Sequence, residues 1–340
     1  MKILSSFHIL ASGVCMLLIV AACKREAPKV TAEHTAQVQA QESKPVRIVE
    51  PEVVQTLLNG HKSLKIIEIS KSEAFAEAHL PGALNIWRPD YENRQDYPYE
   101  GMRATKTQMK ALLSRLGIVP QDTILVYCRG GNVDALRLFW ILDLYGHEHL
   151  LVMNGGFEAW RQAGFPVSKE KSSPIVTDYR FEQPENDAKL ADLEEVLTAI
   201  GDTNIILLDT REAEEFNGFP YIDKGKVWPW KDGASTFGRI PGAVHINWSE
   251  AVELNGDHRF KSLRALRWNF ETRGITPDKT IITYCQSGVR SAHTTFVLTD
   301  ILGYPHVKNY DGSWIEWSYH YHTLHDVPVE RELTEAEHAQ

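Results

Sequence analysis

Cysteine is scarce in this chain: its 340 residues contain four, at positions 15, 23, 128 and 285. Two of these lie in the N-terminal segment, which leaves Cys128 and Cys285 for the folded protein, enough for one disulfide at most. Positive charge is also in deficit, because 36 Lys and Arg oppose 45 Asp and Glu, for a net charge of -9. This composition argues against a nucleic-acid-binding protein, since no basic surplus would attract phosphates. The apolar share of 43% is ordinary for a globular protein, and the length allows two domains.

A long apolar run occurs at the N-terminus, where residues 1–23 read MKILSSFHILASGVCMLLIVAAC. An early lysine, an apolar stretch and then small residues form the layout of an export signal. The uninterrupted stretch is shorter than the about 20 residues that span a bilayer. Its end, VAAC, resembles a bacterial lipoprotein cleavage box, which implies a signal peptide over residues 1–22 and lipidation of Cys23. An uncleaved membrane anchor or a plain signal cut nearby would leave a similar pattern.

Residues 23–45 are polar, without aromatic or aliphatic clusters, and are predicted to be a flexible tether. With the lipoprotein resemblance, this predicts an exported protein held by its lipid to a membrane of the bacterial cell envelope and facing the periplasm. Lys24 stands where aspartate is the usual cue for retention in the inner membrane, which favours the outer membrane.

The remainder of the chain repeats itself. GIVPQDTILVYC, ending at Cys128, matches GITPDKTIITYC, ending at Cys285. The same separation along the chain relates Gly146 to Gly303 and Trp160 to Trp317. Upstream, HLPGALNIW matches RIPGAVHINW at nearly the same separation. Several matches in the same order predict two copies of one domain, joined through the polar segment 168–187.

Each copy alternates short apolar runs with amphipathic segments. The runs LKIIEI, TILVYC, NIILLD and TIITYC are rich in β-branched residues and too short for helices, which predicts buried strands. Segments such as KTQMKALLSRLG, VDALRLFWILDLYG, LADLEEVLTAIG and SAHTTFVLTDILG predict helices, several of which end at glycine. The alternation predicts an α/β fold, with a parallel sheet covered by helices on both faces in each copy. Ligands bind such sheets at the carboxyl ends of the strands, where Cys128 and Cys285 lie.

The sequence CQSGVR after the second strand provides the elements of an anion site. A tight loop entering a helix near Ser291 directs backbone N–H groups toward one centre, and Gly288 permits the turn. The helix N-terminus and Arg290 add positive potential, which favours a thiolate and attracts an anionic substrate. A buried, inert cysteine at a strand end would have the same pattern, so the motif alone leaves both interpretations open.

Four motifs in order resemble the rhodanese family of sulfurtransferases in its tandem, two-domain form. They are LLDTREAEEF, GRIPGAVHINW with Arg239 in place of the family's histidine, YCQSGVR, and YDGSWIEW, with NGGFEAWRQAGFPV as the first copy's closing segment. The resemblance implies a first domain over residues 46–172 that is less active or inactive, and a catalytic second domain over residues 173–340. It also implies a protein that works as a monomer.

The resemblance implies a two-step reaction. The Cys285 thiolate takes the outer sulfur of an anionic donor such as thiosulfate and passes it from a persulfide to a thiophilic acceptor, cyanide or a thiol. Gln286, Ser287, Gly288, Val289 and Arg290 would form the anion cradle, and Arg211 would face the donor. No metal or organic cofactor is implied, and the histidines at positions 320, 322 and 325 are expected to be structural or solvated.

Two alternatives remain open for the function. Mercaptopyruvate-specific relatives carry a second arginine in the long segment between Glu215 and Gly238, where this chain has Lys224, Lys226 and Lys231 instead. That difference and the terminal Arg290 favour thiosulfate as the donor. The other alternative is a redox sensor of the cell envelope that holds persulfides or anions without turnover.

The first copy keeps a cysteine within a loop that has changed. In CRGGNVDA, Val133 replaces the terminal arginine and Asp134 follows it. Cys128 is therefore a candidate second thiol with three possible roles: a vestige at a structural docking face, a second sulfur carrier, or an oxidation partner of Cys285.

Overall fold

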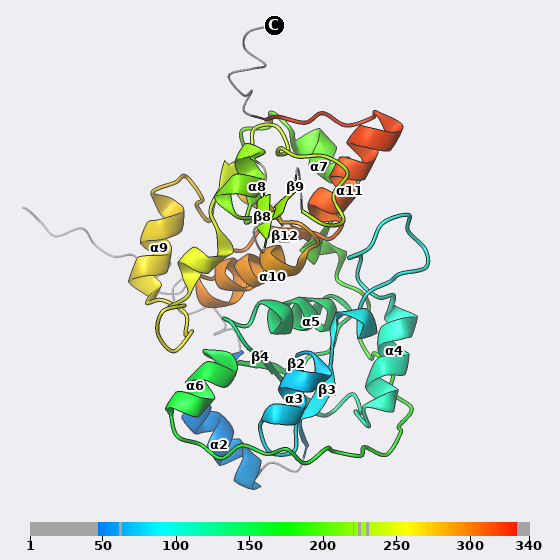
Figure 1. Ribbon diagram of the computed structural model, residues 1–340, viewed down its shortest axis with the longest axis vertical. Coiled ribbons are helices and arrows are strands. Elements are labelled where there is room, and N and C mark those ends of the chain that lie inside the picture. Colours follow the sequence, from blue (N-terminus) through cyan, green and yellow to red (C-terminus); the bar gives the residue numbers. More distant parts are fainter. Residues whose placement is uncertain (1–46, 61–62, 220, 224–225, 229–230, 332–340) are drawn as a thin grey trace, which may run out of the picture. The chain divides into compact units, whose positions relative to one another are not determined.

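Two five-stranded parallel sheets form the framework of this computed structural model, one in each copy of the repeat (Figure 1). The structure describes residues 47–60, 63–219, 221–223, 226–228 and 231–331, which belong to one compact unit. The expected signal peptide, the lipidation site Cys23 and the tether lie outside the described residues. Among the residues that are described, no helix is both long and apolar enough to cross a membrane.

The first sheet has the strand order β1-β5-β4-β2-β3. The elements of this copy are β1 (Ile48–Val49), α2 (Pro51–Gly60), β2 (Leu64–Ile69), α3 (Ser72–Glu77), β3 (Leu84–Ile86), η1 (Arg88–Asp90), α4 (Lys106–Arg115), β4 (Thr123–Cys128), α5 (Val133–Leu144), β5 (Leu150–Met153) and α6 (Gly156–Gln162).

The second sheet has the strand order β10-β7-β11-β12-β6, and β8 and β9 form a separate antiparallel pair. The elements are η2 (Asp187–Lys189), β6 (Leu190–Ala191), α7 (Leu193–Ala199), β7 (Ile205–Asp209), α8 (Ala213–Asn217), β8 (Tyr221–Asp223), β9 (Lys226–Trp228), β10 (Val244–His245), η3 (Trp248–Ala251), α9 (Leu263–Glu271), β11 (Thr280–Tyr284), α10 (Val289–Phe296), η4 (Val297–Ile301), β12 (Val307–Tyr310), α11 (Ser313–Tyr319) and η5 (His320–Leu324).

Helices cover both faces of each sheet, as the sequence predicted. Alternate side chains of one strand point to opposite faces, so Ile67 of β2 packs with α4 and α5 while Ile66 packs with α2, α3 and α6. In the second copy, Ile281 of β11 packs with α9 and η4, and Ile282 packs with α7 and α11. Strands buried on both faces explain the continuous apolar runs in the sequence. The predicted α/β class is confirmed.

Two predicted helices differ in detail. The segment predicted as one helix from Leu190 begins as strand β6, which pairs with β12. Asp192 then caps α7 by accepting a hydrogen bond from the N–H of Glu195, so the helix cannot extend further back. Helix α10 begins at Val289, two residues before the expected start, and its last residues continue as the π-helical turn η4.

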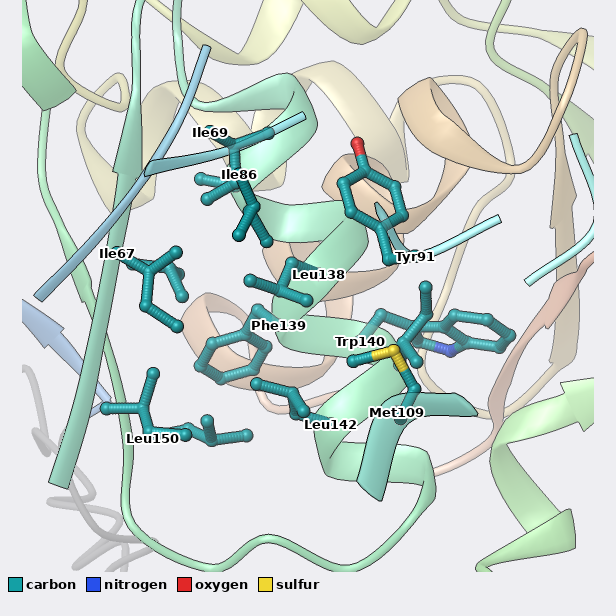
Figure 2. Packing of buried hydrophobic residues seen from close by; sticks show 14 of the residues in the cluster. Ile67, Ile69, Ile86, Tyr91, Met109, Leu138, Phe139, Trp140, Leu142 and Leu150 are labelled. Atoms are coloured by element: carbon teal, nitrogen blue, oxygen red, sulfur yellow. The ribbon is translucent and has the colours of Figure 1, made fainter. Parts of the chain in front are cut away.

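The two copies share a core through helices α5 and α10, which lie side by side in Figure 1. Phe139 of α5 and Phe296 of α10 meet edge to face with ring centroids 5.1 Å apart. Figure 2 shows the first-copy part of this cluster, where Leu138, Phe139 and Trp140 of α5 pack with Ile67, Met109 and their neighbours. Because α10 carries the residues that follow the second loop, this shared core places first-copy side chains beside that loop.

Candidate active site

The Cys285 loop lies between the end of β11 at Tyr284 and the start of α10 at Val289. Gly288 has a φ of 74°, in the left-handed region that favours glycine. A larger residue would also clash at this position, because a Cβ atom there would lie 2.6 Å from Nη1 of Arg137 and 2.8 Å from the carbonyl oxygen of Asp311. The loop is therefore fixed by the strand before it, the helix after it and a residue of the first copy.

Cys285 is a buried, free thiol whose surroundings favour its charged form. Burial alone would raise its pKa, but the positive charge of Arg290, the hydroxyl of Ser291 and the backbone N–H groups of Ser291 and Ser287 together lower it. The Ser291 hydroxyl lies 3.5 Å from Sγ. Ser287 is one of the predicted cradle residues, whereas Ser291 belongs to the first turn of α10.

Arg290 is held beside the thiol by a buried carboxylate. Its two terminal nitrogens donate to Glu215 at 2.6 and 2.9 Å, and Lys231 lies 3.6 Å from the same carboxylate. Burial would raise the pKa of Glu215, but Arg290 and Lys231 lower it to about 2. Burial and the neighbouring Arg290 hold the pKa of Lys231 below its usual range. Two cationic side chains thus share one carboxylate beside Cys285.

Ser313 organises the other side of the loop, a role that was not predicted from the sequence. Its hydroxyl accepts hydrogen bonds from the N–H of Cys285 at 3.2 Å and of Gly288 at 3.0 Å, and donates to the carbonyl of Tyr310. One N–H group of the predicted anion cradle, that of Gly288, therefore points to this side chain. The serine of YDGSW was the available signal, but no periodicity relates it to the loop.

A cavity of about 660 Å³ opens in front of Cys285 and is lined by both copies. Second-copy residues in its wall include Gln286, Ser287, Val289, Arg290 and Lys231. First-copy residues include Trp87, Arg88, Arg94, Arg129 and Asp134. This space is far larger than a thiosulfate ion requires, so it has room for an acceptor that is an organic molecule.

The predicted cradle residues occupy different places around this cavity. Gln286, Ser287, Val289 and Arg290 line it, whereas Gly288 forms the base of the loop. The side-chain amide of Gln286 donates to the carbonyl of Asp232 at 3.2 Å. Lys231 is the lysine of the long segment that reaches the cavity wall, while Lys224 lies outside the described residues.

The structure does not bring Arg211 into the Cys285 cavity. Its side chain is 1% exposed and donates to both oxygens of Asp209 and to the carbonyl of Gly238, with Trp314 stacked against it. It borders a small neighbouring hollow shared with Gln286 and Lys231. The reason for this placement is local: Asp209, the last residue of β7, lies two residues before Arg211 and pairs with its side chain. Arg211 thus supports the wall behind the loop rather than facing the cavity.

The first copy holds an arginine in an equivalent setting, but from another part of the chain. Arg129, directly after Cys128, pairs with Glu68 at 3.4 Å and stacks on Phe157 at 3.8 Å. Glu68 and Phe157 correspond to Asp209 and Trp314 of the second copy. Sequence alignment could not reveal this exchange, since Arg211 follows β7 whereas Arg129 follows β4.

Cys128 is a buried, free thiol that does not line the large cavity, although its neighbours Arg129, Gly130 and Val133 do. Its sulfur lies 3.3 Å from the carbonyl of Arg129. Burial and the negative charge of Asp134 raise its pKa, in contrast to the lowered pKa of Cys285. Asp134 occupies the position that Ser291 has in the second loop. The loss of the loop arginine and this added carboxylate both disfavour a thiolate.

The first loop also differs in how its backbone is held. Asn132 accepts a hydrogen bond from the N–H of Cys128 at 3.0 Å and donates to the carbonyl of Met153 at 2.6 Å. Those bonds replace the ones that Ser313 makes in the second copy. The position of Ser313 is taken by Gly156, where a Cβ atom would lie 2.2 Å from the carbonyl of Cys128. The first loop is thus kept folded by another side chain although its charge pattern has changed.

In the part of the chain that the structure describes, no three or more His, Cys, Asp or Glu side chains gather in a way that could hold a metal ion.

Comparison with known proteins places these features in a family. The sequence profile of the rhodanese-like domain matches twice, over residues 50–163 and 192–320. The thiosulfate sulfurtransferase of Azotobacter vinelandii is 31% identical over 283 residues, covering 83% of this chain and 96% of that protein. The sulfur carrier protein TtuD of Thermus thermophilus is 35% identical over 291 residues, covering 84% of this chain and 96% of that protein.

Solved structures show the same fold. The anaerobic ergothioneine biosynthesis enzyme of Chlorobium limicola, in complex with trimethyl histidine, superposes with a TM-score of 0.70 at 24% identity. The match covers 85% of this chain and 71% of that one. At this level of identity the likeness concerns the fold alone.

Proposed function

Because the chain belongs to the rhodanese-like family, in two copies that confirm the resemblance of its motifs, we propose that it is a thiosulfate sulfurtransferase acting through a Cys285 persulfide. The sulfurtransferase class is supported by relatives of that name over most of the chain. The observation that carries the proposal is the contrast between the two thiols. Cys285 has a lowered pKa and opens on the cavity, whereas Cys128 has a raised pKa and does not line it.

The first half-reaction follows from the groups around Cys285. The thiolate attacks the outer sulfur of thiosulfate, a new S–S bond forms, and the donor's own S–S bond breaks with its electron pair leaving on sulfite. The N–H groups of Ser287 and Ser291 stabilise negative charge on the cysteine sulfur before attack. Arg290 and Lys231 supply positive charge in the cavity wall for the anionic donor and for departing sulfite.

In the second half-reaction, cyanide or a thiolate attacks the outer sulfur of the persulfide and the Cys285 thiolate leaves, so the enzyme returns to its starting state without an added oxidant or reductant. The polar first-copy wall faces the space where this acceptor would lie. Thiosulfate is favoured over mercaptopyruvate because Arg290 stands within the loop and the long segment carries lysine rather than arginine.

Turnover separates this proposal from its alternatives. The full-length chain is incubated with excess thiosulfate and cyanide, and thiocyanate is counted per protein molecule for the wild type, Cys285→Ala and Cys128→Ala. We expect many turnovers in the wild type and in Cys128→Ala, and none in Cys285→Ala. Turnover with mercaptopyruvate but not thiosulfate would reassign the donor, and a single sulfur per molecule without turnover would favour the sensor.

A further inference from the structure

A buried arginine of the first copy touches the backbone of the second copy's catalytic loop. Arg137, on α5, is 1% exposed and lies against Gly288. Its Nη1 donates to the Gly288 carbonyl at 3.4 Å, and its Nη2 donates to the carbonyl of Gly101 at 3.1 Å. The first of these bonds crosses from one copy to the other and ends within the CQSGVR motif.

The same guanidinium neutralises a carboxylate below the loop. Asp311, which follows β12, is 2% exposed, and one of its oxygens accepts from Nη2 of Arg137 at 2.5 Å. Its other oxygen accepts from Nη1 of Arg103 at 2.9 Å. Burial would raise the pKa of Asp311, but these two arginines hold it below its usual range. Asp311 is therefore a buried anion whose partners both come from the first copy.

Asp311 is close to the groups that shape the loop. Its carbonyl oxygen packs against Gly288, and two residues later Ser313 accepts the N–H groups of Cys285 and Gly288. A negative charge left unpaired here would oppose the thiolate, because Coulomb interactions are strong in a buried setting. The arginine that cancels this charge also holds the loop carbonyl.

We propose that Arg137 is a positioning residue of the active site, through which the first copy fixes the Gly288 carbonyl and cancels the charge of Asp311 beneath the catalytic loop. The inference rests on the proposed function in that Cys285 is taken as the reacting group. It gives the first copy a role in the chemistry that does not require Cys128 to react.

The proposal predicts shifts of opposite sign from the two partners of one ion pair. Loss of Arg137 uncovers the Asp311 carboxylate and frees the Gly288 carbonyl, so the thiolate of Cys285 becomes less stable. Loss of the Asp311 charge leaves Arg137 unpaired and positive, so the thiolate becomes more stable. A loop that was simply loosened would change in the same direction in both variants. The other charged groups facing the Cys285 loop stay unchanged. From the second copy they are Arg290, Lys231, Asp232, Glu212 and Glu215, and from the first they are Arg88, Glu92, Arg94, Glu100, Arg129 and Asp134.

The test measures the reactivity of Cys285 without requiring sulfur transfer. In the full-length chain, the rate of alkylation of Cys285 by iodoacetamide is followed across pH through the mass of the peptide that contains it. We expect Arg137→Met to move the midpoint of the profile upward by about one pH unit, which leaves about tenfold less thiolate below the midpoint. Arg137→Lys should shift it less, since lysine keeps the charge but not the fork of donors. Asp311→Asn should move the midpoint downward.

Arg47→Met is the matched control. Arg47 also bridges the copies, pairing with Asp143 at 2.9 Å and Asp300 at 3.4 Å, yet no contact joins it to the catalytic loop. Its removal should leave the midpoint unchanged. An unchanged midpoint in folded Arg137→Met, an upward shift in both Arg137→Met and Asp311→Asn, or an equal shift in Arg47→Met would overturn the proposal. If Arg137→Met does not fold, Arg137→Lys and Asp311→Asn decide by the same signs. Absence of turnover in the wild type would refute the sulfurtransferase function and leave this midpoint test intact.

Discussion

Glu215 offers a direct test of the electrostatics beside Cys285, through the replacement Glu215→Gln. Its pKa falls from the ordinary 4.5 to about 2, and its side chain is only 7% exposed. A folded-state pKa below the unfolded value contributes stability above pH 4.5, which is lost as the pH falls toward 2. A shift of this size corresponds to about 3 kcal/mol, of which about 2 kcal/mol should be gone at pH 3.

Urea unfolding of wild type and Glu215→Gln, measured from pH 7 to pH 3, tests the predicted dependence of the unfolding free energy on pH. The wild type should be more stable by a few kcal/mol at pH 7, and the difference should shrink by about 2 kcal/mol at pH 3. Glu100→Gln is the control, because Glu100 lines the Cys285 cavity but is 73% exposed. Parallel pH profiles for wild type and Glu215→Gln would refute the claim that Arg290 is held by an ionised, buried Glu215.

Three further outcomes are expected. Ser291→Asp, which gives the second loop the residue of the first, should raise the pKa of the Cys285 thiol and slow sulfur transfer at pH 7 by about tenfold or more. The control Ser291→Ala should lose less activity, and an unaltered pH–rate profile in Ser291→Asp would contradict the prediction. Gly101→Ala should reduce turnover and stability, because Gly101 has a φ of 93° and its Cβ would lie 2.7 Å from that of Ser287, and wild-type melting and turnover would count against it. Cys23→Ala should move the protein from the membrane fraction to the soluble fraction of cells, and unchanged fractionation would remove the lipid-anchor proposal.

Patterns local in the sequence predicted much of the fold. The runs around LKIIEI and TIITYC are continuous apolar strands because the sheets are covered on both faces, and the strand ends place both cysteines at loops that enter helices. The Cys285 loop was predictable for the same reason: Cys285, Gly288 and Arg290 lie within six residues, so their relation depends on one turn.

The supports of that loop depend on contacts between distant segments. Ser313 and Glu215 reach it from other elements, and Arg137 reaches it from the other copy. Arg211, predicted to face the donor, lies elsewhere for a local reason, since Asp209, two residues before it, holds its side chain in the wall behind the loop. The exchange of Ser313 for Asn132 is invisible to alignment, because the two side chains satisfy the same N–H from different positions.

The central claim is that Cys285 carries sulfur, and the intact mass of the full-length chain tests it most directly. Wild type, Cys285→Ala and Cys128→Ala are incubated with thiosulfate, weighed, and weighed again after cyanide is added. We predict one added sulfur on wild type and Cys128→Ala, removed by cyanide as thiocyanate, and none on Cys285→Ala. Sulfur on Cys285→Ala that is lost in Cys128→Ala would place the reaction in the first copy and contradict the account.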